Sequence, residues 1–552
     1  MPLLQRRIGL LFALFFGLLC VAALRTVWVG TVRGASLRQV GNVQHSQRVP
    51  VPAVRGAITD RNGVDLALSE PADDVAVTPY LIKDPAGAAR RLAPLLGRPV
   101  DQLLGELTQR GGFVYLARHV PDARVRAILR LQLPGIQTTP VTTRVYPRGL
   151  LGSQVLGLVG VDGHGLSGLE YSRDRQLRGS AGQRQIVNDA IGQPISVKDS
   201  GAAVPGQGVR LTIDAVLQQR VEDVLGAVGR AYQPKDATAI VMNPTTGEVL
   251  AMANWPRVNA NNSAGAPAAA LQNRAVGFDY EPGSTFKVVT VAGALEDGLV
   301  TPQTSFDLPP QIQVADRTIH DAENRGAQTM TTGEILARSS NVGAVTIGER
   351  LGRVRFDTWV RRFGFGAPTG ADLPGEESGA VLPVSHYSGS SMGNLPIGQG
   401  ELVTPLQMAT AYAAIANGGV LRPPRVVQSV GGRVAPVPTG RRVVSSATAA
   451  QLRDMLRGVL APGGTASEVS IPGYELAGKT GTANKVDPAS GQYSNSRYVA
   501  SFVGFAPASH PKLLTAVMVD EPSTTFYGGV VAAPAFGQIM GFALPYLQIP
   551  PG

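Results

Sequence analysis

An uncharged run from Ile8 to Leu24 constrains this chain more strongly than any other feature of its sequence. An apolar run of this length is unstable in water, and it approaches the length of helix that spans a bilayer. Arg6 and Arg7 lie directly before the run. Arg25 can extend its cation to the membrane interface, so the helix can continue toward residue 32. We therefore expect a membrane anchor near the N-terminus.

The alternative for this run is a signal peptide that is removed after export. Ala22 and Ala23 are its main support, but no small-x-small site followed by a polar segment accompanies them. Cys20 follows a leucine rather than a small residue, so it resembles a lipoprotein site only loosely. We expect a retained single-pass anchor, with residues 1–7 as a cytoplasmic tail, residues 8–32 in the membrane and the remainder outside.

The composition limits the classes of partner and cofactor that we expect for this chain. The chain of 552 residues has a formal net charge of +10 but no run of Lys and Arg interleaved with aromatic residues, which favours an anionic envelope over nucleic acid. One cysteine excludes an intramolecular disulfide, and the six scattered histidines form no metal-binding pattern. We expect no cofactor, no metal and no nucleic-acid partner.

The strongest chemical signal lies between a breaker pair, Pro282-Gly283, and a later stop, Gly298. This spacing predicts a helix about four turns long that opens at Ser284. Ser284 and Lys287 are three residues apart, so they share a helix face and can meet. A serine attacks a carbonyl when a base takes its proton, and a buried lysine of lowered pKa can be that base.

Two further motifs follow in the chain. Ser339 and Asn341 stand between two helical patterns, and a Lys-Thr-Gly-Thr segment from Lys479 opens a predicted strand. Side chains alternate along a strand, so Thr480 and Thr482 should share one face and Lys479 the other. The three motifs in this order resemble those of the penicillin-binding transpeptidases and serine β-lactamases.

The resemblance implies that Ser284 is acylated by the D-Ala-D-Ala end of a peptidoglycan stem peptide, or by a β-lactam that mimics it. It implies Lys287 as the base, with Ser339 and Lys479 relaying the proton to the leaving amine. Asn341 would bind the amide of the acyl chain. Thr480, Gly481 and Thr482 would bind the substrate's carboxylate. The backbone N–H groups of Ser284 and Thr482 would stabilise the oxyanion.

The segment after the anchor carries its own motifs. Asn62-Gly63 predicts a tight hairpin turn inside the segment 55–63. This segment, with Arg144–Pro147 and Gly165–Glu170, resembles the pedestal of class B penicillin-binding proteins. No glycosyltransferase signature precedes it. A linker rich in Pro and Gly, Gly201–Gly208, leads us to place the stalk and dimerisation-type pedestal domain at residues 33–205 and the transpeptidase domain at residues 206–552.

The expected fold class is α+β: a transmembrane helix, a mixed, β-rich pedestal and a β-lactamase-like transpeptidase domain. In the last of these, Asp214 should cap a helix, and residues 238–252 should form a hairpin. Residues 497–506 and 513–520, with the Lys479 strand, would complete the sheet. The resemblance implies five antiparallel strands with helices on both faces.

Two other patterns are coincidental on our interpretation. Gly163–Gly168 fits a dinucleotide-binding fingerprint, but the segment that follows is too polar to pack under a parallel sheet. Gly389–Gly393 fits the nucleophile elbow of esterases, which requires a helix directly after the serine. Pro396 and three nearby glycines argue against such a helix.

The leading hypothesis is a peptidoglycan D,D-transpeptidase. A β-lactamase or β-lactam sensor of the same fold, and a non-catalytic scaffold of the division machinery, are the alternatives. Residues 497–507, 520–522 and 527–534 resemble the division-specific FtsI type, with elongation and sporulation members as close cousins. The resemblance implies these partners: stem peptides, β-lactams, the cytoplasmic membrane, an FtsW-type glycan polymerase and other divisome proteins.

Overall fold

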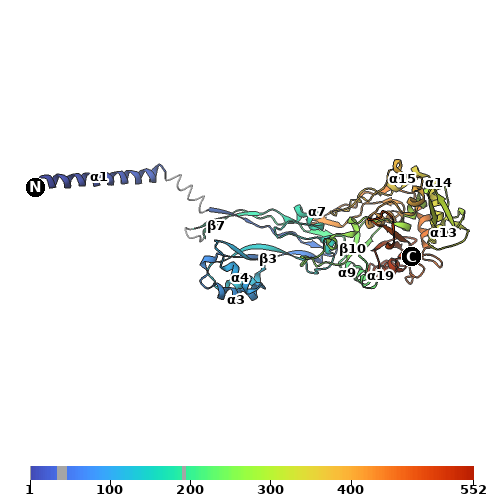
Figure 1. The fold of residues 1–552 in the computed structure, drawn as a ribbon, viewed down its shortest axis with the longest axis horizontal. Coiled ribbons are helices and arrows are strands. Elements are labelled where there is room, and N and C mark those ends of the chain that lie inside the picture. The colour runs from blue at the N-terminus through green and yellow to red at the C-terminus, as the bar shows by residue number, and fades with distance from the viewer. Residues whose placement is uncertain (1, 34–45, 189–193, 552) are drawn as a thin grey trace. The chain divides into compact units, whose positions relative to one another are not determined.

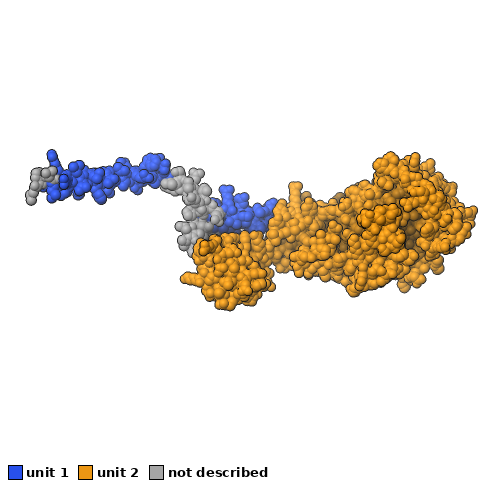
Figure 2. Space-filling view, viewed as in Figure 1, with its two compact units in different colours: residues 1–54, 179–206 blue, residues 55–178, 207–552 orange. Residues whose placement is uncertain are grey.

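The computed structural model describes residues 2–33, 46–188 and 194–551. Part of the expected stalk, residues 34–45, lies outside the described residues. Contacts divide the chain into two compact units, which Figure 2 colours separately: residues 1–54 with 179–206, and residues 55–178 with 207–552. The domain boundaries expected from the sequence stay predictions.

The first unit contains the expected anchor. Helix α1, Pro2–Thr31 (Figure 1), is apolar and long enough to cross a membrane between Leu4 and Thr31, and no side chain from Leu4 to Thr31 is buried. This helix fits a membrane anchor. The unit also holds an antiparallel sheet of three strands: β1 (Ser46–Val51), β6 (Gly182–Asn188) and β7 (Pro194–Gly201).

A seven-stranded sheet runs through the second unit. The Asn62-Gly63 turn joins β2 (Ile58–Thr59) to β3 (Asp65–Val77), with Gly63 at φ +89°, which confirms the predicted hairpin. Strand β2 also pairs in parallel with β8 (Val209–Leu211), so strands on both sides of the predicted domain boundary share one sheet. The other strands are β4 (Val114–Pro121), β5 (Ile136–Val145), β16 (Val427–Val430) and β17 (Arg433–Val434).

A small lobe with its own hydrophobic core forms at the far part of β3. Val75 and Val77 from β3 pack with Leu92 and Leu103 from the helices that cover the strand. The lobe's helices are α3 (Pro85–Leu96), α4 (Val100–Leu107) and α5 (Asp122–Leu129), after the 3₁₀ turn η1 (Pro79–Leu81). Three short helices follow in the chain: α6 (Ser153–Leu156), α7 (Gly168–Ser172) and α8 (Asp174–Arg178).

The three pedestal motifs converge on one buried ion cluster. Arg55 Nε lies 2.6 Å from Glu170 Oε2, and Arg144 Nε lies 2.7 Å from Glu170 Oε1. Arg55 also binds Asp174 Oδ1 at 2.7 Å. Because one carboxylate joins two cations from segments far apart in the chain, these motifs hold the pedestal together.

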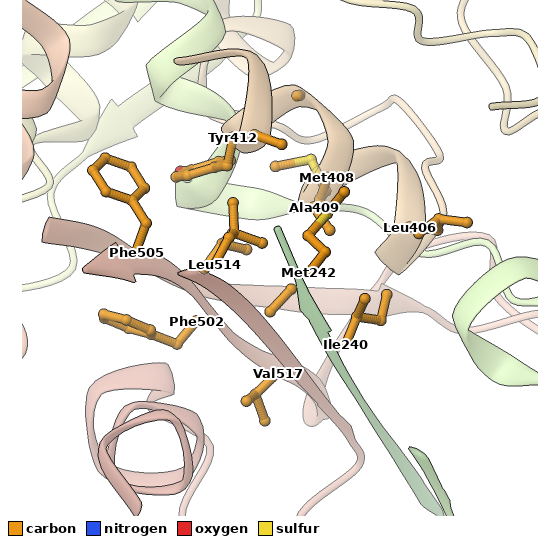
Figure 3. Packing of buried hydrophobic residues seen from close by; sticks show 14 of the residues in the cluster. Ile240, Met242, Leu406, Met408, Ala409, Tyr412, Phe502, Phe505, Leu514 and Val517 are labelled. Carbon is orange, nitrogen blue, oxygen red and sulfur yellow. The ribbon is translucent and has the colours of Figure 1, made fainter. Parts of the chain in front are cut away.

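Strands between residues 236 and 520 form a five-stranded antiparallel sheet in the order β10-β9-β21-β20-β19, which confirms the expected sheet. Tyr412 and Met408 from a covering helix approach one face, whereas Phe502 points to the other (Figure 3). There the Phe502 ring lies 4.7 Å from that of Phe536. The strands are β9 (Asp236–Met242), β10 (Val249–Trp255), β19 (Ala477–Val486), β20 (Tyr493–Ala506) and β21 (Leu513–Asp520).

Three helices cover this sheet. Asp214 accepts hydrogen bonds from Val216 N and Leu217 N, both at 3.0 Å, so it caps α9 (Ala215–Tyr232) as predicted. The other two are α17 (Pro405–Ala416) and α19 (Gly528–Tyr546). Helix α19 is also long and apolar enough to span a membrane, but 56% of its apolar stretch is buried inside the protein.

The remaining elements surround the sheet or lie between these helices. The helices and 3₁₀ turns are α10 (Ala268–Leu271), α11 (Arg274–Gly277), η2 (Gly283–Phe286), α12 (Lys287–Glu296), α13 (Thr332–Ala337), α14 (Asn341–Leu351), α15 (Arg353–Arg362), η3 (Val384–His386), α16 (Ser391–Asn394), η4 (Leu395–Ile397) and α18 (Ser446–Arg457). The short strands are β11 (Ser305–Leu308), β12 (Gln311–Val314), β13 (Arg317–His320), β14 (Gln328–Thr331), β15 (Val420–Leu421) and β18 (Arg441–Arg442).

Candidate active site

Ser284 lies on a tight turn that leads into helix α12. Residues Gly283–Phe286 form a 3₁₀ turn that leads directly into the α-helix from Lys287, so the helix predicted to open at Ser284 is present, with a first turn in the 3₁₀ form. Gly283 has φ +54°, and a Cβ there would stand 2.8 Å from the carbonyl oxygen of Thr482. The turn therefore packs directly on β19, which an ordinary side chain at this position would prevent.

Lys287 joins the first motif to the second. Its side chain is fully buried, and Nζ donates to the carbonyl of Ser339 at 2.6 Å, to Oδ1 of Asn341 at 2.6 Å and to Oγ of Ser339 at 3.2 Å. Within the described ranges, no hydrogen bond joins Lys287 to Ser284. Two of the acceptors come from Ser339, between α13 and α14, and the third from Asn341, the first residue of α14, so the start of this helix holds the amine in place.

Ser339 reaches the amine because of an unusual backbone conformation. Its φ of +60° lies in the left-handed region, which costs a residue with a side chain on the order of 1 kcal/mol or more. Both its carbonyl and its hydroxyl point at Lys287 as a result. The next residue, Ser340, caps α14 by accepting a hydrogen bond from Gly343 N at 2.9 Å.

Asp321 holds this segment from the other side. Its carboxylate accepts hydrogen bonds from Asn341 N, from Val342 N at 3.1 Å and from Ser340 Oγ at 3.1 Å. Arg325 forms an ion pair with the same carboxylate. No local pattern marks Asp321 for this contact, because its partners lie about twenty residues further along the chain.

Lys479 lies at the start of β19, as the third motif predicts, but its contacts differ from the expectation. The side chain is fully buried, and Nζ donates to the carbonyl of Thr480 at 3.2 Å and to its hydroxyl at 3.3 Å. In the part of the chain that the structure describes, Lys479 makes no hydrogen bond to Ser339. The proton relay that the resemblance implies for Ser339 and Lys479 stays a prediction, because their side chains are not directly hydrogen-bonded among the described residues.

The two threonines of the third motif have different surroundings. Thr480 is buried, and its hydroxyl lies 2.7 Å from that of Thr465. Thr482 is half-buried, and its hydroxyl accepts a hydrogen bond from Gly528 N at 3.1 Å. The N-terminus of α19 thus covers this part of β19 and leaves Thr482 the more accessible of the two.

Close packing around position 481 explains why this residue is a glycine. A Cβ at this position would stand 2.3 Å from Oγ of Ser501 and 3.0 Å from the carbonyl of Pro282. Only a residue without a side chain lets the Ser284 turn approach β19 this closely. Gly481 therefore brings the first and third motifs together through its small size.

The site keeps two lysine amines away from water. Burial lowers the pKa of Lys287 well below its usual value, and the nearby cation of Lys479 lowers it further, while Asp321 opposes this shift. Burial alone lowers the pKa of Lys479 to about 7. An uncharged Lys287 amine has a lone pair that can take a proton from a serine hydroxyl.

Comparison with known proteins identifies the family of this chain. The penicillin binding protein transpeptidase domain matches residues 237–541, and the penicillin-binding protein dimerisation domain matches residues 50–211. The chain belongs to the penicillin-binding proteins, and within them it is a class B member of the FtsI type.

Similar proteins come from several bacteria. Peptidoglycan D,D-transpeptidase FtsI of Escherichia coli strain K12 is 34% identical over 552 residues, which cover 98% of this chain and 92% of the relative. Stage V sporulation protein D of Bacillus subtilis is also 34% identical, over 98% of this chain and 86% of the relative. The crystal structure of penicillin-binding protein 3 from Mycobacterium tuberculosis with aztreonam has a TM-score of 0.72 and 32% identity, and the match covers 91% of this chain and 98% of that one.

Proposed function

We propose that this chain is a peptidoglycan D,D-transpeptidase that cross-links stem peptides through an acyl-enzyme on Ser284, and that β-lactams inhibit it by acylating the same serine. The observation that carries the proposal is the buried Lys287 amine, which lies three residues after Ser284 and bonds only to uncharged oxygens of Ser339 and Asn341. A desolvated amine of low pKa is a suitable base for a serine hydroxyl.

The reaction then proceeds in two transfers. Lys287 removes the proton from Ser284, whose Oγ attacks the carbonyl of the penultimate D-Ala while the N–H groups of Ser284 and Thr482 stabilise the oxyanion. The carbon–nitrogen bond to the terminal D-Ala breaks, and the departing amine receives a proton through Ser339 with Lys479. An amine of a second stem peptide attacks the ester, which forms the cross-link and restores Ser284.

The other motif residues hold the substrate. Asn341 binds the amide of the acyl chain, and the hydroxyl of Thr482 takes the terminal carboxylate with Thr480 behind it. Gly481 supports this arrangement by letting the nucleophile turn lie against the strand. Burial of Thr480 and its bond to Thr465 suggest that Thr482 makes the more direct contact of the two threonines.

Mass spectrometry of protein incubated with a penicillin tests this proposal, with Ser284→Ala as the control. A stable adduct on Ser284 is expected, because a transpeptidase has to keep water from its acyl-enzyme until an amine arrives. Rapid hydrolysis of the adduct would favour a β-lactamase instead. Absence of any adduct would favour the non-catalytic scaffold.

We further propose a role in septal wall synthesis, with α1 as a single-pass anchor whose N-terminus is inside and an FtsW-type glycan polymerase as a partner. Equal identity to FtsI and to a sporulation protein does not distinguish these roles, so the segments that resemble the FtsI type support this choice. A fluorescent fusion should gather at division sites; even distribution along the cell wall would favour elongation.

The partnership has its own experiment. Replacing Ile8–Leu24 with an unrelated membrane helix should impair division even though the protein stays membrane-bound. The original helix would contribute contacts that a generic anchor lacks. Full complementation by the exchanged helix would contradict the proposed contact with the polymerase.

A further inference from the structure

We propose that Asp321 and Arg325 act as a pair of positioning residues, which hold Asn341 against Lys287 and set the charge of the Lys287 amine. The inference rests on the proposed role of Lys287 as the base. Neither residue belongs to the three sequence motifs, and both lie between β13 and β14, outside the elements that carry those motifs.

The contacts of Asp321 lead directly to the second motif. Asp321 is 6% exposed, and its carboxylate accepts hydrogen bonds from the first two N–H groups of α14, those of Asn341 and Val342. A carboxylate at a helix N-terminus is stabilised by these donors and by the helix dipole. The hydrogen bond to Asn341 N fixes the backbone position from which the Asn341 side chain extends.

The side chain of Asn341 is fixed at both ends of its amide. Nδ2 donates to the carbonyl of His320 at 3.0 Å, which leaves Oδ1 to accept from Lys287 Nζ at 2.6 Å. His320 precedes Asp321 in the chain, so one short segment holds both the backbone and the amide of Asn341. A shift of Asp321 would therefore move the acceptor that faces the Lys287 amine.

The same pair contributes opposite charges near Lys287. The charged groups that act on this amine are the cation of Lys479 on β19, the carboxylate of Asp321 and the guanidinium of Arg325. Asp321 favours the protonated amine, whereas Arg325 and Lys479 favour the neutral one. Arg325 is ion-paired to Asp321, so it partly cancels the effect of that carboxylate on Lys287.

Opposite effects of two substitutions test the proposal. Asp321→Asn removes a negative charge and should lower the pH at which Lys287 titrates by about half to one unit. Arg325→Met removes a positive charge and should raise that pH by a similar amount. Arg325→Lys restores the cation and should return the titration toward the parental value.

Two readouts separate this inference from the proposed function. Nuclear magnetic resonance of isotopically labelled lysine, in a Ser284→Ala background, follows the Lys287 amine without any acylation. The pH profile of the penicillin acylation rate, measured with Ser284 present, follows its chemical consequence. Opposite shifts of the amine resonance support the inference, whereas no shift or shifts of one sign would overturn it. If the resonance shifts but the acylation profile does not follow, Lys287 is not the base and the proposed function has to be revised.

Asp357 and Arg361 provide a matched control. They form another pair four residues apart, with Arg361 Nη2 at 3.1 Å from Asp357 Oδ1, but neither is among the charges that act on Lys287. Asp357→Asn should leave the titration of Lys287 unchanged. A shift as large as that of Asp321→Asn would contradict a specific role for the Asp321 pair.

Discussion

The pedestal and the active site both bury cations, but they surround them differently. In the pedestal, Arg55 and Arg144 share the carboxylate of Glu170, whose side chain is fully buried. In the active site, Lys287 is equally buried but donates only to uncharged oxygens. A bound carboxylate stabilises the charged form of its partner, whereas burial without one stabilises the neutral form. The first arrangement suits a structural joint and the second suits a base.

The largest expected effect is on Lys287, the buried amine that has no carboxylate partner among the described residues. Lys287→Ala should slow acylation by penicillin on the order of a hundredfold to ten-thousandfold, because it removes the proposed base. The variant should stay folded, since the lost amine is not part of the apolar core. Rapid-quench measurement of adduct formation checks the rate, with the exposed Lys512→Ala as a control. Acylation at the parental rate would show that the base lies elsewhere.

Loss of the ion pairs in the pedestal should lower the stability of the protein and leave the rate of acylation unchanged. Glu170→Gln leaves two buried guanidinium groups without their shared charge, which typically costs about 3–5 kcal/mol. Denaturant unfolding followed by circular dichroism should show this loss, while the acylation rate of the folded fraction stays near parental. Asp174→Asn, at a carboxylate that is 19% exposed, should cost less. Equal losses from the two variants would contradict the special place of Glu170.

The effect of Lys479 on stability should depend on pH, because this lysine is buried without a carboxylate partner among the described residues. Burial sets its pKa in the folded protein to about 7, whereas an unfolded lysine titrates near pH 10.4. Between these values the unfolded chain binds the proton and the folded chain does not, so this group makes stability rise with pH. Lys479→Met removes the contribution. The unfolding temperature of the parent, relative to that of Lys479→Met, should therefore be higher at pH 9 than at pH 7. The same difference at both pH values would contradict a lowered pKa of Lys479.

The smallest effect is expected where burial is absent. Arg457 Nη2 lies 2.7 Å from Glu475 Oε1, but the two side chains are 44% and 45% exposed. Water and salt screen such a pair, so Glu475→Gln should cost less than about 1 kcal/mol. The same denaturant titration used for Glu170→Gln measures it. A loss comparable to that of the pedestal cluster would mean that pairing, and not burial, decides the cost.

Much of the fold could be predicted from local patterns. Asn62-Gly63 forms the expected turn, Asp214 caps the expected helix, and the five strands pair as the resemblance implies. The turn and the cap depend on a few neighbouring residues, whose backbone preferences act over short distances. The pairing of the strands joins distant segments and was expected from the resemblance. The 3₁₀ turn at Ser284 was missed because it depends on close packing of Gly283 against Thr482, far along the chain.

The sequence by itself predicted which residues would carry the chemistry, because Ser284 and Lys287 keep their spacing in any helical segment and the later motifs keep their order. Only the tertiary structure decided what each charge faces. It turned the Lys287 amine toward Ser339 and Asn341, left Lys479 bonded to Thr480, and placed Asp321 under the start of α14. The pKa of a buried group depends on every charge and dipole within several ångströms, and those groups come from distant parts of the chain.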